Sequence, residues 1–558
     1  MESNKESWES IAKAKRQSLA AAIPKEWIIP AEILPPPIQA DVTTFPSKSG
    51  WFTKRELDIL STDAAKILKC LSTGAWASEE VTRVFCKAAA AAHQLASSWI
   101  QSRGITNCLS EIFFDEAIAR AKECDAYLQK YGKIKGPFHG LPISIKDNFN
   151  IIGKDSTIGM TSLVNKPATY NSTLIDIILD AGAVLYVKTN VPTAVMLPET
   201  VNNVFGRTLN PLNRNLTPGG SSGGESALLA FGGSRIGVGS DIGGSLRIPA
   251  ACTGTFTLRP SAGRFPHCRA RSGLTGQEAV NSVNGPMAKT LEEIVLYSKI
   301  IIDQQPWFLD PKCLPIPWRS IEPKKHLKLA VFWHDGVVTP TPPVARALRE
   351  TVKRLRAGGH EIVEWDPVEH KTANSLLRRM FIADGAKSIR GLLAPTNEPF
   401  RPEMPSYEDS VELGVHEMWQ IQAERSDLQK RYLDRWNALG VDGLICPTSP
   451  YSSVEHGKFT YGGYTGVYNL LDYSAVSFPC GVTVDKNVDA AYSGHHPLSE
   501  IDAQVQRDYD ATMVNGLPVS LQLVARRLEE EMVLMMTDVI LQSLQGSGIS
   551  ISRTRSNL

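Results

Sequence analysis

The chain has 558 residues, enough to bury a large core as one α/β domain or as two ordinary ones. Its 42% hydrophobic and 21% charged residues are typical of a soluble globular protein, and its formal net charge is +1. This balance excludes a strongly basic surface, so we expect neither nucleic acid nor a membrane as a partner.

The cysteines and the first residues bear on the compartment. The nine cysteines are scattered, odd in number and without a CxxC pair, which favours free thiols over disulfides or a zinc site. The polar N-terminus has no apolar signal-peptide core, so we expect a cytoplasmic protein. The tail Ser556-Asn557-Leu558 only loosely matches a peroxisomal tripeptide, and we interpret it as an ordinary frayed end.

We expect residues 1–100 to form a helical segment that packs on the main body, because it is too small for a domain of its own. Helical spacing occurs at Asp63–Leu71 and Ser78–His93, after a Pro-rich connector at Ile33–Ile38. The remaining residues, 101–558, are expected to form the main domain.

From Leu141 onward, short apolar runs alternate with amphipathic segments. The predicted strands are Leu141–Ile145, Ala183–Lys188, Lys328–Trp333, Glu361–Trp365 and Gly443–Cys446. The predicted helices are Thr173–Asp180, Pro343–Gly358, Arg425–Leu439 and Glu529–Leu544. This alternation predicts an α/β sheet covered by helices on both faces. A Pro- and Trp-rich stretch, 304–323, is expected to be a surface connection between two halves.

Two clusters rich in glycine and serine, Pro218–Ser226 and Gly237–Arg247, allow three interpretations. They fit plain loops. They also fit an anion-binding turn, although no lysine follows the glycines and their spacing departs from the dinucleotide fingerprint. Finally, Gly243-Gly244-Ser245 fits a nucleophile on a tight turn, where backbone N–H groups face the same space as the hydroxyl.

A serine nucleophile needs a base. The eleven histidines, among them His139, His267 and His456, lack a triad context such as GxSxG. Lys146 follows the apolar run Leu141–Ile145, and burial there would favour a neutral amine that accepts a proton. Most lysines at strand ends are solvated, so spacing alone leaves the choice of base open.

These residues and their flanks resemble the amidase signature family. The matching segments are Gly136–Asp147, Lys188–Pro192, Phe205–Thr208, Asn210–Pro211, Pro218–Glu225, Ser240–Pro249, Leu258–Pro260, Gly285–Glu293 and Asn515–Val519. Within that family the chain is most similar to fungal acetamidase-type general amidases, through the segments around Trp8, Glu199–Asn203 and Tyr468–Asp472. The resemblance implies an α/β fold with a mixed central sheet, an N-terminal helical extension and a catalytic core at about 136–290.

The resemblance also implies the site. Ser245 would attack the amide carbonyl while Ser221, after a cis peptide bond from Gly220, relays a proton to Lys146, without metal or cofactor. The implied oxyanion donors are the N–H groups of Ile242, Gly243, Gly244 and Ser245. The implied supporting residues are Ser222, Asp241 and Arg247. The candidate substrate-binding residues are Met196, Gly219, Gly220, Tyr464 and Asp472, with Tyr451 and Tyr461 as further candidates for the pocket wall.

The predicted function is hydrolysis of a small-molecule carboxamide to a carboxylic acid and ammonia or an amine. The alternative is biosynthetic acyl transfer, in which an amine or alcohol captures the same acyl-enzyme. The sequence does not separate the two, because they differ in which acceptor the pocket admits. An amidotransferase subunit and a non-catalytic binding protein are disfavoured, and a homodimer is left open.

Overall fold

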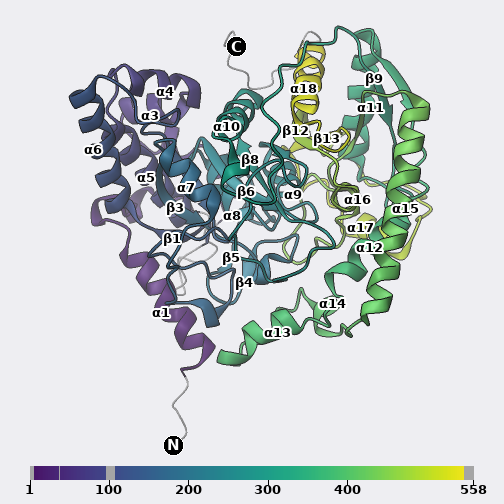
Figure 1. Ribbon diagram of the computed structural model, residues 1–558, viewed down its shortest axis with the longest axis horizontal. Coiled ribbons are helices and arrows are strands. Elements are labelled where there is room, and N and C mark those ends of the chain that lie inside the picture. The colour runs from purple at the N-terminus through teal and green to yellow at the C-terminus, as the bar shows by residue number, and fades with distance from the viewer. Residues whose placement is uncertain (1–5, 37, 96–106, 546–558) are drawn as a thin grey trace, which may run out of the picture.

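The computed structural model describes residues 6–36, 38–95 and 107–545, and this part of the chain is built around one large sheet (Figure 1). The sheet has eleven strands in the order β1-β3-β2-β6-β8-β7-β12-β13-β11-β9-β10. Their bounds, in this order, are Leu109–Ile112, Val184–Thr189, Pro142–Lys146, Ile236–Asp241, Val283–Ala288, Phe256–Arg259, Ala475–Thr483, Pro518–Val524, Gly443–Pro447, Lys328–Val331 and Glu361–Glu364. A separate ribbon pairs β4 (Val201–Asn202) with β5 (Gly206–Arg207).

The sheet is mixed. Strand β2 runs parallel to β3 and β6, and β9 runs parallel to β10 and β11, whereas the other neighbours are antiparallel. A parallel pair needs a crossover connection, which helix α7 (Thr173–Asp180) supplies between β2 and β3. Helix α11 (Pro342–Ala357) does the same between β9 and β10. The expected mixed α/β sheet is confirmed.

Further helices surround the sheet. They are α1 (Trp8–Ala21), α2 (Phe45–Lys48), α3 (Lys54–Ser61), α4 (Ala64–Ser72), α5 (Ser78–Leu95), α6 (Phe114–Tyr131), α8 (Gly223–Phe231), α9 (Arg247–Thr253), α10 (Leu291–Asp303), α12 (His370–Phe381), α13 (Lys387–Leu393), α14 (Pro405–Glu408), α15 (Val415–Leu439), α16 (Gly463–Leu471), α17 (Glu500–Arg507) and α18 (Glu530–Gln545). No described helix is both apolar enough and long enough to cross a bilayer.

Strand β6 shows how helices cover both faces. Side chains alternate between the faces of a strand, so Ile236 and Val238 point one way while Gly237 and Gly239 point the other. The two glycines face α8: a Cβ on Gly237 would lie 2.0 Å from the Glu225 side chain, and one on Gly239 would lie 2.8 Å from Ser222 Oγ. Helix α8 therefore rests directly on the strand.

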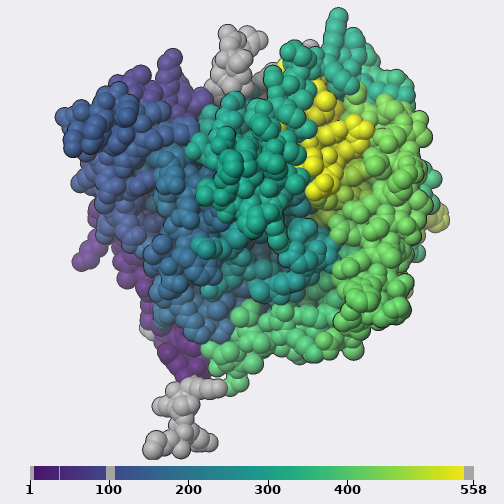
Figure 2. Space-filling model, in the orientation of Figure 1, coloured from purple at the N-terminus to yellow at the C-terminus, as the bar shows by residue number. Residues whose placement is uncertain are grey.

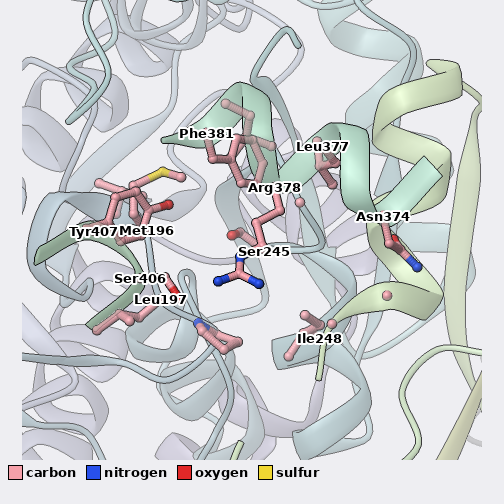
Figure 3. A pocket seen from close by; sticks show the side chains of 18 of the residues that line it. Met196, Leu197, Ser245, Ile248, Asn374, Leu377, Arg378, Phe381, Ser406 and Tyr407 are labelled. Carbon is pink, nitrogen blue, oxygen red and sulfur yellow. The ribbon is translucent and has the colours of Figure 1, made fainter. Parts of the chain in front are cut away.

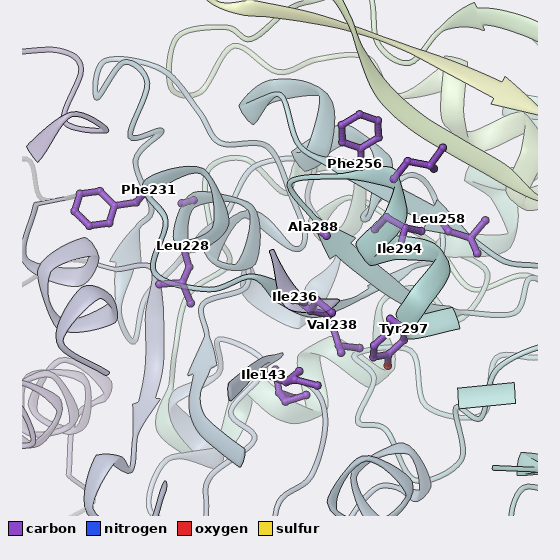
Figure 4. Close-up of a cluster of buried hydrophobic side chains, with 14 of the residues drawn as sticks. Ile143, Leu228, Phe231, Ile236, Val238, Phe256, Leu258, Ala288, Ile294 and Tyr297 are labelled. Atoms are coloured by element: carbon purple, nitrogen blue, oxygen red, sulfur yellow. The ribbon is translucent and has the colours of Figure 1, made fainter. Parts of the chain in front are cut away.

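The opposite face carries the hydrophobic core of this half. Ile143, Ile236 and Val238 are buried in one cluster with Ile294 and Tyr297 of α10, as Figure 4 shows. Burying a side chain of this kind contributes about 1.5–3 kcal/mol to the free energy of unfolding. The core thus fixes β2 and β6 side by side, and Ser144 of β2 faces α8, where it donates to Glu225.

Helices α1 to α5 belong to the predicted N-terminal segment and lie along one side of the molecule in Figures 1 and 2 (purple and blue). Helix α1 is held to the body by Lys15, which forms ion pairs with Glu111 and, at 2.8 Å, with Asp155. Helix α5 belongs to the same hydrophobic cluster as the sheet. The proposed boundary at residues 100 and 101 and the tail Ser556–Leu558 lie outside the described residues.

Several elements differ from the prediction. Helix α15 begins at Val415, well before the predicted start at Arg425. The prediction missed the first turns because they are exposed and lack a clear apolar stripe. Strand β12 contains Pro479, and a proline argues against a central strand, but a register shift after Pro479 accommodates it. The stretch 304–323 connects α10 to β9, as expected, and the nine cysteines are free.

Candidate active site

Lys146 is the last residue of β2 and is fully buried. Its Nζ donates to Ser221 Oγ at 2.8 Å, to Ser240 Oγ at 2.9 Å and to the Ser240 carbonyl at 3.2 Å. Burial lowers the pKa of Lys146 to about 7, although nearby carboxyl groups oppose that change. A substantial fraction of the amine is therefore neutral near neutral pH.

The nearby carboxyl group of Glu225 stabilises the protonated form of Lys146 only weakly. Glu225 lies in the first turn of α8 and accepts hydrogen bonds from Ser144 and, at 2.7 Å, from Thr189. Burial raises the pKa of Glu225 to about 7, so this carboxyl group carries less negative charge than an exposed one. Among the described residues Lys146 forms no salt bridge, and its neutral form is not opposed by a direct counter-ion.

Ser221 and Ser222 lie at the start of α8, after a cis peptide bond between Gly220 and Ser221. The Ser222 N–H donates to the carbonyl of Ser245 at 3.2 Å, which brings the two Gly-Ser clusters together. Ser222 Oγ also donates to the Ser240 carbonyl at 3.3 Å. Within the described part of the chain, no hydrogen bond joins the Ser221 and Ser245 hydroxyls, so the relay between them stays a prediction.

Asp241 organises the loop that carries Ser245. Its carboxylate accepts from the N–H groups of Gly244, at 2.8 Å, and Leu246, at 3.1 Å. It also pairs with Arg247 at 3.1 Å, and both side chains are fully buried. Burial opposes the charged form, but Arg247 holds the pKa of Asp241 well below its ordinary value. The loop is therefore wrapped around one buried carboxylate.

Only glycine fits at position 244. Its φ is +132°, and a Cβ there would lie 2.1 Å from Thr465 Oγ1. The N–H groups of Ile242, Gly243 and Ser245 donate to no described residue. The Gly244 N–H donates to Asp241 in this structure, and the set of four oxyanion donors that the resemblance implies stays a prediction.

Replacing Asp241 by asparagine should lower the free energy of unfolding by about 3–5 kcal/mol, because Arg247 would remain buried without a counter-charge. Urea denaturation followed by circular dichroism would measure the loss. The control is Glu417→Gln, which breaks the exposed pair with Arg379 and should cost less than about 1 kcal/mol. Equal losses in the two variants would contradict the role given to Asp241.

Ser245 lines a cavity of about 320 Å³ (Figure 3). Most of the wall is apolar, with Leu197, Ile248, Leu377 and Phe381 among its members. The labelled side chains in Figure 3 converge on the space next to Ser245 from several directions. A carbonyl group of a bound molecule can thus approach this hydroxyl from the cavity.

The cavity tests the predicted substrate-binding residues. Met196 and Gly220 lie in its lining, whereas Gly219, Tyr464 and Asp472 do not. The Tyr464 hydroxyl is buried and donates to the Val338 carbonyl at 2.6 Å. Asp472 instead forms ion pairs with Arg259, at 3.0 Å, and Arg527, at 2.8 Å. Gly219 packs on the backbone of Pro249, with 2.8 Å from an added Cβ to the Pro249 Cα.

Gly219, Tyr464 and Asp472 thus make structural contacts outside this cavity, and a role for them in substrate binding stays a prediction. Tyr451 and Tyr461 are also absent from the lining: their hydroxyls contact Thr460 and Asp335.

Helix α12 supplies a wall that the sequence analysis missed. Its pocket-lining residues are Asn374, Leu377, Arg378 and Phe381, which recur at the spacing of one helix face. That spacing was visible in the sequence, as was an arginine on the same helix face as Leu377 and Phe381. The sequence did not show that this helix face packs next to Ser245.

Three comparisons place this geometry among known proteins. A family model described as "Amidase" matches residues 80–534. The chain is 38% identical to an acetamidase of Emericella nidulans, and the match covers 96% of this chain and 98% of the relative. It is 36% identical to an acetamidase of Aspergillus oryzae with the same coverage. A solved fatty acid amide hydrolase is 33% identical and superimposes with a TM-score of 0.91, over 97% of this chain and 95% of that one.

Proposed function

The chain belongs to the amidase family and is an amide hydrolase, and we propose that it works through an acyl-enzyme on Ser245. In this proposal Lys146 is the base, and Ser221 carries the proton between Lys146 and Ser245. The observation that supports it most is the 2.8 Å contact between a fully buried lysine amine and the Ser221 hydroxyl. Burial without a salt bridge keeps a substantial fraction of this amine neutral near neutral pH, so it is available to accept a proton.

The first half of the reaction forms the acyl-enzyme. The Ser245 Oγ attacks the carbonyl carbon as its proton moves through Ser221 to neutral Lys146, and the carbonyl electron pair moves to oxygen. The N–H groups of Ile242, Gly243 and Ser245 stabilise this oxyanion, each contributing about 3 kcal/mol. As the oxyanion collapses, the C–N bond breaks and the relayed proton passes to the departing amine.

The second half releases the acid. Water attacks the acyl carbon and gives a proton to the same relay, and the Ser245 oxygen leaves and regains its proton. Because an amine is a poor leaving group, its protonation is as important as the attack itself, and general acid–base catalysis contributes about 10²–10⁴ in rate. Lys146 serves as base in the attack and as acid in the departure.

The cavity supports a small carboxamide with an apolar acyl group as the substrate. Its volume of about 320 Å³ lies at the low end of ligand pockets, and Ile248, Leu377 and Phe381 give it an apolar wall. The net charge of +1 supports a small molecule rather than a nucleic acid. The nine free cysteines support a reducing compartment such as the cytoplasm.

A fluorophosphonate probe should label Ser245 alone among the serines, because only an activated hydroxyl attacks it rapidly. Peptide mass mapping would locate the label, and pentanamide or another short amide should slow labelling by competition. The Ser406→Ala variant, altered in the same cavity, should still be labelled. Labelling at another serine, or labelling that amides do not slow, would overturn the proposed nucleophile.

Adding an amine acceptor such as hydroxylamine to the turnover assay distinguishes hydrolysis from acyl transfer. The hydrolase assignment predicts that the free acid forms at the same rate as ammonia when no acceptor is present. If product formed only once the acceptor was added, acyl transfer would be the main reaction.

A further inference from the structure

Arg378 is a cation in a cavity whose wall is otherwise apolar or neutral. It lies on α12, one residue from Leu377 and three from Phe381, and all three line the cavity beside Ser245. No aspartate, glutamate or lysine lines it with them. Figure 3 shows the Arg378 side chain extending from α12 into the cavity, with its guanidinium on the same side as Ser245.

The described residues offer Arg378 neither an ion pair nor a side-chain hydrogen bond. Its neighbour Arg379 differs, because that guanidinium pairs with Glu417 at 2.9 Å. Exposed arginines without partners are common on protein surfaces, but this one projects into the space that the substrate enters. A guanidinium presents five N–H donors in a planar fork that matches a carboxylate.

From this geometry we infer that Arg378 selects amides that carry an anionic group, a carboxylate above all, on the acyl chain away from the scissile bond. The inference rests on the proposed function, because it takes Ser245 as the point where the scissile carbonyl binds. The apolar wall between the two sites would hold the methylene groups of the chain. Half-amides of dicarboxylic acids are the simplest molecules of this class.

The size of the effect follows from the exposure of Arg378. A charge-assisted hydrogen bond is stronger than a neutral one, but solvent screening weakens it at an exposed site. We therefore expect a preference of about tenfold in kcat/KM for the charged substrate over an uncharged one of the same shape. The optimal chain is the one whose length spans from Ser245 to Arg378.

Matched pairs of primary amides test the inference. Each pair joins a half-amide (glutaramic, adipamic or pimelamic acid) with the neutral amide in which an isopropyl group replaces the carboxylate. Ammonia release gives kcat/KM for both. At the best chain length the charged member should be hydrolysed about tenfold more efficiently. Raising the salt concentration should reduce that ratio, because ions screen an exposed charge pair.

Two variants assign the preference to Arg378. Arg378→Gln should bring the ratio to about one, chiefly by raising KM for the charged member. Arg378→Glu should reverse the selection, so that 6-aminohexanamide becomes better than its neutral partner. The matched control is Arg379→Gln on the same helix, which should leave the ratio unchanged. A ratio near one in the wild type at every chain length, or a preference that survives Arg378→Gln, would overturn the inference.

Binding without turnover separates this inference from the proposed mechanism. Calorimetry on the Ser245→Ala variant should show adipamic acid binding about tenfold more tightly than its isopropyl partner, and Arg378→Gln should abolish the difference. Equal binding of the two would refute the role of Arg378 even if Ser245 were confirmed as nucleophile. Conversely, turnover retained by Ser245→Ala would refute the mechanism, and the charge preference would still be measured.

Discussion

Replacing Ser245 by alanine should lower kcat by about 10⁴–10⁶-fold and leave the free energy of unfolding nearly unchanged. A triad nucleophile contributes about this much, because without it only binding and the oxyanion donors accelerate hydrolysis. The Ser245 hydroxyl forms no hydrogen bond with the described residues, so its loss removes no structural contact. Ammonia release from a short amide and urea denaturation would measure the two quantities.

The control for Ser245 is Ser406→Ala, a serine from another wall of the same cavity. It should change kcat/KM by less than about tenfold, because losing one neutral hydrogen bond to a substrate costs about 0.5–1.5 kcal/mol. Ser245→Ala activity above about one per cent of the wild type, in protein free of contaminating amidase, would overturn the assignment.

Replacing Lys146 by alanine should lower kcat by about 10³–10⁵-fold, because Ser221 would lose the base that contacts its hydroxyl. The wild-type pH profile should report the same group. Since burial lowers the pKa of Lys146 to about 7, kcat/KM for a neutral amide should level off above that pH. Below it, kcat/KM should fall about tenfold per pH unit as the amine becomes protonated.

Lys146→Arg gives the sharpest control for the neutral amine. Arginine keeps the positive charge but stays protonated at any pH that a protein tolerates, so it cannot accept the Ser221 proton. It should therefore be as inactive as the alanine variant from pH 6 to pH 9. A folded Lys146→Arg enzyme with wild-type kcat/KM would show that position 146 supplies charge rather than base strength.

The sequence predicted those parts of the fold that have local causes. The run Leu141–Ile145 is apolar, so the strand was foreseeable, whereas the burial of Lys146 at its end was not, because most lysines at strand ends are solvated. Helix α7 has the predicted bounds, Thr173–Asp180, because apolar spacing and Gly182 mark it on the chain itself. Strand β12 was missed, since its partners β7 and β13 are distant in sequence and Pro479 interrupts its pattern.

In the candidate site, too, the residues with a local sequence signal were predicted and those that depend on tertiary packing were not. Lys146, Ser221 and Ser245 came from motif context, and the structure brings the three segments together. The pocket wall depends on how α12 docks, which no local pattern encodes. Tyr464 was a reasonable candidate from the sequence, but its side chain points into the core beside Val338 instead.

The loop that carries Ser245 has a consequence for how the enzyme matures. Arg247, which holds Asp241 and thereby the loop, donates to the Thr465 carbonyl at 3.1 Å, to Asn469 at 2.6 Å and to Gln522 at 3.2 Å. During translation these partners emerge more than two hundred residues after the nucleophile. A nascent chain that already carries Lys146, Ser221 and Ser245 therefore lacks the supports of its own catalytic loop, and we expect the enzyme to become active only after Gln522 has been synthesised and packed.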